Sequence, residues 1–284
     1  MNAMARFAVI GHPIGHTLSP ILHTANFRAL GFDGTYGACD VAPDELASAL
    51  RRFVAEGYLG INCTIPHKEA VLPLMTRLDA SAVRCAAVNT VKIEPDGAMV
   101  GYNTDCTGFS LSLEEKGVSC AGRHIVLLGA GGAARAVAVA CLDGGCASLA
   151  IANRTRAKAE TLAAALADLA HGRVLALGGA ETPETRQALC AADLIVNATA
   201  VGLKADDPSA VPADVLQSGQ IVCDIIPVRR ETATLAAARA AGAMAVGGLG
   251  MLVHQGAAAF RIWTDLEPDV SAMFRAVLAL AGGF

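Results

Sequence analysis

The sequence predicts an α/β protein of two domains. A mixed-sheet unit is expected over residues 1–105 and a doubly wound parallel-sheet unit over 106–248, with 249–284 returning to the first. Three observations predict this fold. Strand-like and helix-like segments alternate along almost the whole chain, one strand ends in a glycine-rich turn that opens a helix, and the last stretch holds two helices without a strand.

Length and composition set the bounds of the interpretation. The chain has 284 residues, which is long enough for two domains. Its composition, with 54% hydrophobic and 17% charged residues, excludes global disorder. The start does not resemble an export signal, and no apolar run reaches a membrane-spanning length. The net charge of −4, without a basic block, argues against nucleic acid. We expect a cytoplasmic monomer or homodimer without membrane or nucleic-acid partners.

Cysteine and histidine spacing gives no sign of a metal site. The nine cysteines contain no C-x-x-C pair, and none of the seven histidines pairs with another at metal-ligand spacing. In the cytosol such cysteines are expected to be reduced and to pack mostly as small apolar residues.

The first domain begins with three strands, each followed by a helix, and ends in a hairpin. Strands are expected at 6–11, 35–41 and 58–65, with helices from Pro20, over 43–55 and after 65. Segments 87–94 and 98–104 flank Pro95-Asp96-Gly97, a hairpin turn, so the sheet should be mixed.

The second domain repeats strands and helices at the spacing of a doubly wound sheet. A helix over about 107–116 stops at Gly117. Strands are expected at 124–129, 147–152, 173–177, 193–199, 221–226 and 243–247. The final helices, 250–263 and 268–282, are expected to pack back on the first domain.

A glycine-rich turn marks a candidate dinucleotide site. Gly129-Ala130-Gly131-Gly132-Ala133 follows a strand and opens a helix, in the pattern G-x-G-x-x-A of Rossmann-type domains. Glycines there allow the backbone to approach the pyrophosphate, which faces the helix N-terminus. The alternative is a tight strand-to-helix turn without a ligand.

The next strand ends in Asn153-Arg154-Thr155-Arg156, where NAD-binding domains usually carry an acid for the ribose. Arg154, Arg156 and Lys158 would instead pair with the 2′-phosphate of NADP, and Asn153 and Thr155 add neutral hydrogen-bonding groups. The alternative is an exposed basic helix start, which the helix dipole disfavours. The pattern therefore favours NADP over NAD.

Lys68 lies in GINCTIPHKE (60–69), where Pro66 suits the first helical position and places the lysine in the first turn. A cation there opposes the helix dipole, and sequences tend to break such local rules at functional sites. The alternative is a solvated lysine on an amphipathic helix.

Asp105 and Ser19 each have a structural and a functional interpretation. Asp105 could cap the following helix, or hydrogen-bond a substrate hydroxyl and Lys68. Ser19 could be an N-cap before Pro20, whereas Thr17 has no such role, and the two hydroxyls could bind a carboxylate.

Eight motifs, in order along nearly the whole chain, resemble the shikimate dehydrogenase family. They are GHPIGHTLSP (11–20), NCTIPHKE (62–69), AVNT (87–90), NTD (103–105), GAGGAARA (129–136), NRTR (153–156), NATAVGL (197–203) and GLGMLVHQGAAAF (248–260). The resemblance implies a reversible, NADPH-dependent reduction of 3-dehydroshikimate to shikimate, a step of chorismate and aromatic amino-acid biosynthesis.

The same resemblance implies roles for individual residues. Lys68 would be the acid/base, oriented by Asp105, while Thr17 and Ser19 would hold the substrate carboxylate. The residues implied to position the ring hydroxyls are Asn62, Thr64, Asn89 and Gln255. The further residues implied on the cofactor side are Thr199, Ile225 and Gly248, the last two near the nicotinamide.

Two departures from the family pattern keep alternatives open. Thr17 stands where the family often has serine, and Pro227 stands where it usually has a tyrosine, three residues after Asp224. A quinate dehydrogenase or another paralogue is the alternative within this chemistry. A non-catalytic NADPH sensor is the alternative of another class, but a sensor has no need of both Lys68 and Asp105.

Overall fold

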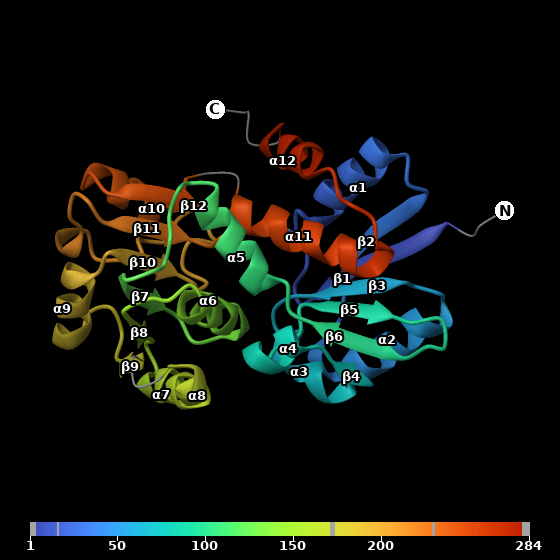
Figure 1. Ribbon diagram of the computed structural model, residues 1–284, viewed down its shortest axis with the longest axis horizontal. Helices are drawn as coiled ribbons and strands as arrows, with labels where there is room; N and C mark the ends of the chain where they lie inside the picture. Colours follow the sequence, from blue (N-terminus) through green and yellow to red (C-terminus); the bar gives the residue numbers. More distant parts are fainter. Residues whose placement is uncertain (1–3, 16, 171–173, 229–230, 280–284) are drawn as a thin grey trace. The chain divides into compact units, whose positions relative to one another are not determined.

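The computed structural model describes residues 4–15, 17–170, 174–228 and 231–279. The chain divides into a first unit, Met1–Gly108 with Leu252–Phe284, and a second unit, Phe109–Met251. Each unit is built on its own six-stranded sheet (Figure 1).

The first unit has a mixed sheet with the strand order β2-β1-β3-β5-β6-β4. Its strands are β1 (Ala5–Gly11), β2 (Gly34–Asp40), β3 (Gly60–Cys63), β4 (Arg77–Leu78), β5 (Thr90–Ile93) and β6 (Met99–Tyr102). Strand β1 is parallel to β2 and β3, whereas β5 is antiparallel to β3 and β6, which is the hairpin that the sequence predicts. The edge strand β4 is parallel to β6.

Helices cover both faces of this sheet. Alternate residues of β1 point to opposite sides, and the buried apolar side chains on each side pack against helices. The helices are α1 (Ser19–Leu30), α2 (Leu46–Ala55), α3 (His67–Ala70), α4 (Ala80–Cys85), α11 (Leu249–Thr264) and α12 (Val270–Ala279), with 3-10 turns η1 (Pro43–Glu45) and η2 (Leu72–Leu74). Ala8 and Ile10 pack against α2. Phe7 and Val9 join an aromatic core with Phe27 of α1 and residues of α11.

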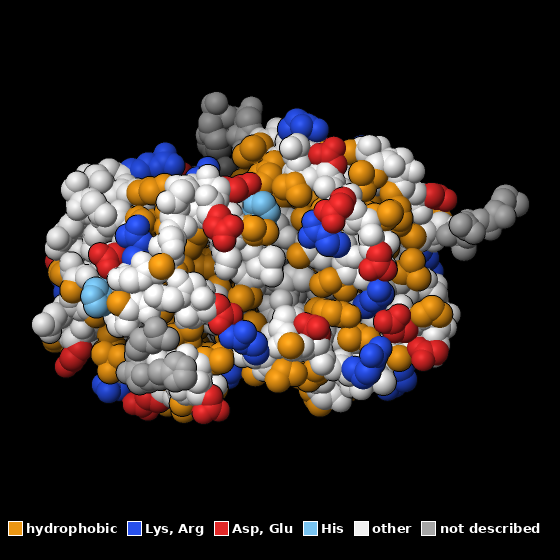
Figure 2. All heavy atoms as spheres, viewed as in Figure 1, with side chains coloured by type: hydrophobic (Ala, Val, Ile, Leu, Met, Phe, Trp, Pro, Cys, Tyr) orange, Lys and Arg blue, Asp and Glu red, His pale blue; other side chains and the backbone are white. Residues whose placement is uncertain are grey.

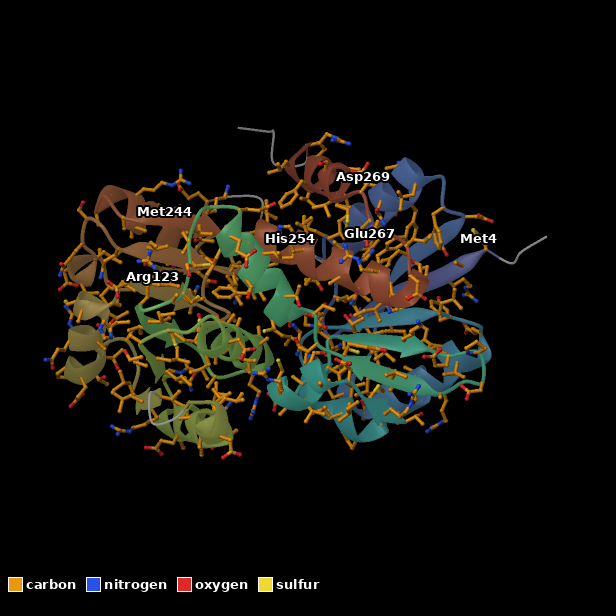
Figure 3. All side chains as sticks on the ribbon, viewed as in Figure 1. Met4, Arg123, Met244, His254, Glu267 and Asp269 are labelled. Atoms are coloured by element: carbon orange, nitrogen blue, oxygen red, sulfur yellow. The ribbon has the colours of Figure 1, made fainter. Side chains whose placement is uncertain are left out.

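The C-terminal helices complete the first unit, as the sequence predicts. Trp263 of α11 stacks on Phe7 at 5.0 Å, and its indole N–H donates to Val91 O at 2.9 Å. A Cβ on Gly60 would lie 2.3 Å from Trp263 Nε1, so β3 needs a glycine beneath this ring. In the connection between α11 and α12, where Figure 3 labels Glu267 and Asp269, the Asp269 N–H donates to Asn26 Oδ1 of α1 at 2.7 Å. The part of the expected helix 268–282 beyond Ala279 lies outside the described residues.

The second unit has a parallel sheet with the order β12-β11-β10-β7-β8-β9. Its strands are β7 (His124–Leu128), β8 (Ser148–Ala152), β9 (Val174–Leu177), β10 (Leu194–Asn197), β11 (Ile221–Asp224) and β12 (Met244–Gly247). Counted from β7, this is the 3-2-1-4-5-6 order of a dinucleotide-binding doubly wound sheet. Arg173, expected to begin β9, lies outside the described residues.

The helices of the second unit are short and rich in alanine. They are α5 (Asp105–Glu114, which begins in the first unit), α6 (Gly132–Asp143), α7 (Arg156–Ala165), α8 (Ala167–Ala170), α9 (Pro183–Ala191) and α10 (Ala233–Ala240), with a 3-10 turn η3 (Ala213–Val215). Residues 136–142 of α6 are all buried, which small side chains allow by letting the helix lie close to the sheet. A second core includes Leu189 of α9 and Ala238 of α10.

Three predicted helix starts were wrong. Ser19 is the first residue of α1 and not its cap, because Thr17 Oγ1 already accepts the Ser19 N–H at 3.3 Å. Helix α5 begins at Asp105 and not near 107, because Asn103 Oδ1 accepts the Asp105 N–H at 3.1 Å. Pro66 precedes α3 and is not its first residue, and the four residues of α3 are too few for the dipole argument made for Lys68.

The surface and the thiols carry further information. None of the nine cysteines, all of which the structure describes, forms a disulfide, and six of them are buried. Within the described ranges no group of three or more histidine, cysteine or acidic side chains could hold a metal ion. None of the described helices has both the length and the apolar character needed to cross a membrane. On the face in Figure 2, basic and acidic side chains are interspersed.

Candidate active site

Three segments of the first unit meet at one edge of its sheet. Lys68 follows β3, Asn89 precedes β5 and Asp105 follows β6. Because β5 runs antiparallel to both β3 and β6, the end of each of those strands lies beside the start of β5. Residues distant in the sequence are therefore adjacent at this edge.

Lys68 and Asp105 form a buried ion pair. Lys68 Nζ donates to Asp105 Oδ2 at 2.6 Å, and the two side chains are only 14% and 6% exposed. The alternative of a solvated lysine was therefore wrong. The alternative of Asp105 as a helix cap was also wrong, because its carboxylate accepts from side chains while Asn103 accepts from its backbone.

Asn89 holds the second oxygen of the carboxylate. Its Nδ2 donates to Asp105 Oδ1 at 2.8 Å, and its Oδ1 accepts the Thr104 N–H at 2.8 Å. Gln255 Oε1 of α11 lies 3.5 Å from the same Nδ2, and Asn89 and Gln255 are 2% and 8% exposed. Both oxygens of Asp105 thus have hydrogen-bond donors, which fixes the carboxylate against Lys68.

A second layer lies behind Asn89 and includes residues that sequence reasoning missed. Asn62 Nδ2 donates to Thr90 Oγ1 at 3.0 Å, and Asn62 Oδ1 accepts from the Tyr36 hydroxyl at 2.6 Å. Thr90 Oγ1 lies 3.0 Å from Asn89 Oδ1 and 3.2 Å from Thr104 Oγ1. Tyr36 stands in no motif, and only the structure shows that it is the one buried residue of β2.

The loop after β1 brings Thr17 and Ser19 together. Thr17 Oγ1 donates to Ser19 Oγ at 3.2 Å, and Ser19 is 6% exposed. Thr64, directly after β3, is half-buried, and a Cβ on Gly11 would lie 2.6 Å from its methyl carbon. Gly11 therefore lets the segments after β1 and β3 approach each other.

The turn after β7 fits a dinucleotide pyrophosphate. A Cβ on Gly129, whose φ is +111°, would lie 2.8 Å from Ala198 O, so the protein backbone requires this glycine. A Cβ on Gly131 would meet nothing within 4 Å, which leaves open space at the start of α6. The half-buried Ala130, Gly132 and Ala133 complete the turn. The first N–H groups of α6 lack helical acceptors and are available to an anion.

The basic segment after β8 is accessible. Arg154, Thr155, Arg156 and Lys158 are exposed, and α7 begins at Arg156. Asn153 Nδ2 donates to Thr155 O at 2.9 Å, which shapes the turn, and Arg156 Nε donates to Glu160 Oε1 at 3.0 Å. Cations at a helix start suit an anionic ligand such as a ribose phosphate.

The remaining residues predicted on the cofactor side follow β10, β11 and β12. Thr199 Oγ1 donates to Asn197 Oδ1 at 2.7 Å, which orders the turn after β10. A Cβ on Gly248 would lie 2.4 Å from Ile225 O, so no side chain fits between these two loops. Pro227 is half-buried in the loop after β11. In open α/β sheets, ligands bind at this carboxyl edge of the strands.

Comparisons with known proteins agree with this arrangement. Three family models match in order: the shikimate dehydrogenase substrate binding domain over 9–91, shikimate / quinate 5-dehydrogenase over 112–225, and the shikimate 5′-dehydrogenase C-terminal domain over 248–278. The fold and site are those of a two-domain dehydrogenase with a dinucleotide-binding unit.

Individual relatives narrow the class. The chain is 46% identical to the shikimate dehydrogenase (NADP(+)) of Rubrobacter xylanophilus, over 95% of this chain and 94% of that protein. The shikimate 5-dehydrogenase of Thermus thermophilus, solved with NADP(H) and shikimate, is 38% identical with a TM-score of 0.85, covering 98% and 100% of the two chains. Quinate dehydrogenase of Corynebacterium glutamicum, solved with NAD, is 32% identical with a TM-score of 0.87, covering 97% and 99%. The chain belongs to the shikimate dehydrogenase family.

His23 lies beneath this site without hydrogen-bond partners. Its ring stacks on Tyr36 at 4.2 Å with an interplanar angle of 12°, and both ring nitrogens are buried and unpartnered. Burial lowers the pKa of His23 from 6.5 to about 3. The imidazole is therefore neutral in the folded protein at any pH above that value.

Acid should destabilise the first unit through His23. In the unfolded chain His23 takes a proton below pH 6.5, whereas the folded chain excludes it to about pH 3. The free energy of unfolding keeps this contribution of His23 above pH 6.5 and loses it as the pH is lowered. We expect the loss between about pH 7.5 and about pH 4.5 to be about 2–3 kcal/mol. Urea unfolding at both pH values, followed by the fluorescence of Trp263, the sole tryptophan, measures this loss.

The variant His23→Phe keeps an aromatic ring and should lack this part of the pH dependence. The exposed His124 provides a control, since His124→Gln should keep the wild-type difference between the two pH values. An unchanged pH dependence in His23→Phe would contradict the assignment.

Proposed function

We propose that this chain catalyses the reversible, NADP-dependent interconversion of 3-dehydroshikimate and shikimate. The observation that carries the proposal is the buried contact of 2.6 Å between Lys68 Nζ and Asp105 Oδ2, with Asn89 and Gln255 beside it. A non-catalytic sensor would have no use for a buried, hydrogen-bonded lysine–carboxylate pair, which is costly to maintain.

Lys68 is the proposed acid and base. In the reduction, Lys68 Nζ gives a proton to the carbonyl oxygen that becomes the hydroxyl, and in the oxidation it takes that proton back. Asp105 fixes the direction of the ammonium group, and Asn89 fixes Asp105. NADP, when bound, supplies or accepts the hydride at the ring carbon.

The substrate-binding residues proposed from the family all belong to the first unit. Thr17 and Ser19 present adjacent hydroxyls to the carboxylate, and Thr64 and Gln255 lie on segments next to Lys68 and Asn89 for the ring hydroxyls. Asn62 already donates to Thr90 and accepts from Tyr36. Because an amide oxygen has two lone pairs, a ring hydroxyl can share Asn62 with these partners, and we propose Asn62 with Asn89 among the residues that position the ring hydroxyls.

The cofactor-binding residues belong to the second unit. Open space at Gly131 and the start of α6 suit the pyrophosphate, and the exposed Arg154, Arg156 and Lys158 suit the 2′-phosphate. Thr199, Ile225 and Gly248 are proposed on the nicotinamide side. We propose domain limits of 1–105 with 249–284 for the substrate part and 106–248 for the NADP part.

We further propose that the protein acts in the cytoplasm as a monomer or homodimer, without a nucleic-acid partner. Cysteines without disulfides support the compartment. The net charge of −4 and the interspersed charges on the face in Figure 2 support the absence of a nucleic-acid partner.

Initial-rate assays with four substrate pairs test the reaction. Shikimate and quinate are each offered with NADP⁺ and with NAD⁺, and formation of the reduced nicotinamide is followed. We expect turnover to be strongest with shikimate and NADP⁺. A preference for quinate or NAD⁺ would assign the chain to another branch of the family, with Pro227 as the first position to examine. Binding of NADPH without any turnover would support the sensor.

Replacing the acid/base should affect turnover more than binding. We expect Lys68→Ala to lower kcat by about 10²–10⁴-fold, with a much smaller change in the KM for shikimate. The matched control is Lys92→Ala, because Lys92 pairs with Asp265 outside the proposed site and should keep wild-type kcat. A loss confined to KM in Lys68→Ala would refute the assignment.

Removing the two arginines should change cofactor preference. Because each arginine can form charge-assisted hydrogen bonds with a phosphate, Arg154→Ala combined with Arg156→Ala should weaken NADP⁺ binding by about 10–100-fold and NAD⁺ binding far less. Titration of both cofactors by calorimetry measures this. Arg239→Ala removes an exposed arginine paired with Glu231 and is the control. Equal losses for both cofactors would exclude a phosphate contact.

A further inference from the structure

Asp224 is a fully buried carboxylate at the end of β11 that the proposed reaction does not use. It is 0% exposed, and so is Asn197, the last residue of β10. The two residues are partners in the parallel register of these strands, so their side chains lie next to each other on one face of the sheet. A buried carboxylate is costly unless donors surround it, so its partners indicate what it does.

Three segments of the second unit donate hydrogen bonds to this carboxylate. Asn197 Nδ2 donates to Asp224 Oδ1 at 3.0 Å, and the backbone N–H of Ile226 donates to the same oxygen at 3.2 Å. The Thr232 hydroxyl donates to Asp224 Oδ2 at 2.6 Å. Asp224 therefore joins the end of β10, the turn after β11 and the start of α10 at one acceptor.

Thr232 has a fixed hydrogen-bond direction. Its Oγ1 accepts the backbone N–H of Leu235 at 3.3 Å, which makes Thr232 the N-cap of α10, and Thr232 is 1% exposed. Because a carboxylate oxygen can only accept, the hydroxyl proton lies between Thr232 and Asp224. One hydroxyl thus caps α10 and ties the helix to β11, against which α10 packs (Figure 1).

Asn197 extends the contact to the turn after β10. Its Oδ1 accepts from the Thr199 hydroxyl at 2.7 Å and from the Thr199 N–H at 3.1 Å, and its Nδ2 also donates to Val201 O at 2.9 Å. The Ile225 N–H donates to the backbone oxygen of Asn197 at 3.1 Å. The turn that carries Thr199 is therefore built around the residue that contacts Asp224.

The turn after β11 is also in contact with the turn after β12. A Cβ on Gly248 would lie 2.4 Å from Ile225 O and 2.8 Å from the carbonyl carbon of Ile226, so the Gly248 backbone lies directly against this turn. A shift of Ile225 or Ile226 would therefore shift Gly248 too. Thr199, Ile225 and Gly248, the residues proposed on the nicotinamide side, thus lie on turns that meet at one buried carboxylate.

We propose that Asp224 is a positioning residue, and that its carboxylate holds the turns after β10, β11 and β12 in the arrangement that receives the nicotinamide half of NADP. The inference rests on the proposed function, which assigns Thr199, Ile225 and Gly248 to that half. Asp224 acts through these turns, because a residue with 0% exposure cannot itself contact the cofactor.

The binding of two ligands tests this role without turnover. NADP⁺ contains the nicotinamide half, whereas adenosine 2′,5′-bisphosphate lacks it. Thr232→Val is nearly isosteric and removes the donor to Asp224 Oδ2, and Asp224→Ala removes the acceptor but keeps the cap of α10. In both variants we expect calorimetry to show about tenfold weaker NADP⁺ binding, the equivalent of one net hydrogen bond, and unchanged bisphosphate binding.

Two control variants isolate the hydroxyl and the position of the acid. Thr232→Ser keeps both the donor and the cap and should bind both ligands as the wild type does. Asp193→Asn changes a half-buried acid at the opposite end of β10, where it accepts the His124 N–H at 2.8 Å, and should also bind both normally.

Two results would overturn the proposal and leave the proposed function in place. One is an equal loss of affinity for the two ligands, and the other is wild-type NADP⁺ binding in either Thr232→Val or Asp224→Ala. If Asp224→Ala does not fold, Thr232→Val alone decides.

Turnover gives an independent readout. Because the proposed substrate-binding residues belong to the first unit, Thr232→Val should lower kcat about tenfold with little change in the KM for shikimate. Asp224→Asn should keep more of the kcat than Asp224→Ala, because its remaining oxygen can still accept from Asn197 and Ile226. An unchanged kcat in Thr232→Val overturns the proposal. A wild-type protein that binds NADP⁺ without turning over shikimate would refute the proposed function, and the binding comparison would still decide the role of Asp224.

Discussion

The hydrogen bond between Lys68 and Asp105 is the interaction on which the site of the first unit depends. A buried ion pair is stable only when its remaining lone pairs and protons are satisfied, and here Asn89 satisfies the second carboxylate oxygen. The segments that carry these residues follow β3, precede β5 and follow β6, so the requirement is met only if those three strand ends are adjacent. The antiparallel placement of β5 between β3 and β6 meets it.

The polar row behind this pair is embedded in an aromatic core. Tyr36 is flanked by the ring of His23, and Phe7 and Trp263 belong to the same core. A low-dielectric environment strengthens hydrogen bonds and penalises any group left unpaired, so the row has one favourable arrangement. The same packing keeps His23 neutral, which links the acid stability of the unit to the core that supports its site.

Glycines in the second unit serve two different physical purposes. Gly129 and Gly248 are required by the protein itself, because a Cβ would lie 2.8 Å from Ala198 O in one case and 2.4 Å from Ile225 O in the other. At Gly131 the protein leaves open space, and we infer that a ligand uses that space. Close contacts between loops at Gly129 and Gly248 thus shape the carboxyl ends of the parallel strands, and the open space at Gly131 suits the pyrophosphate.

Contiguous motifs allowed the sequence by itself to determine much of this protein. The strand, glycine turn and helix around Gly129, the basic segment at Arg154 and the pairing of Lys68 with Asp105 were predictable, because local patterns encode strand ends and turn chemistry. Helix starts were less predictable, since side chains such as Thr17 and Asn103 decide them through single hydrogen bonds. Only the tertiary structure identified Tyr36 and the contact of Thr90 with Asn62, because these partners lie on different strands. Strand register, which depends on the packing of the whole sheet, brings those partners together.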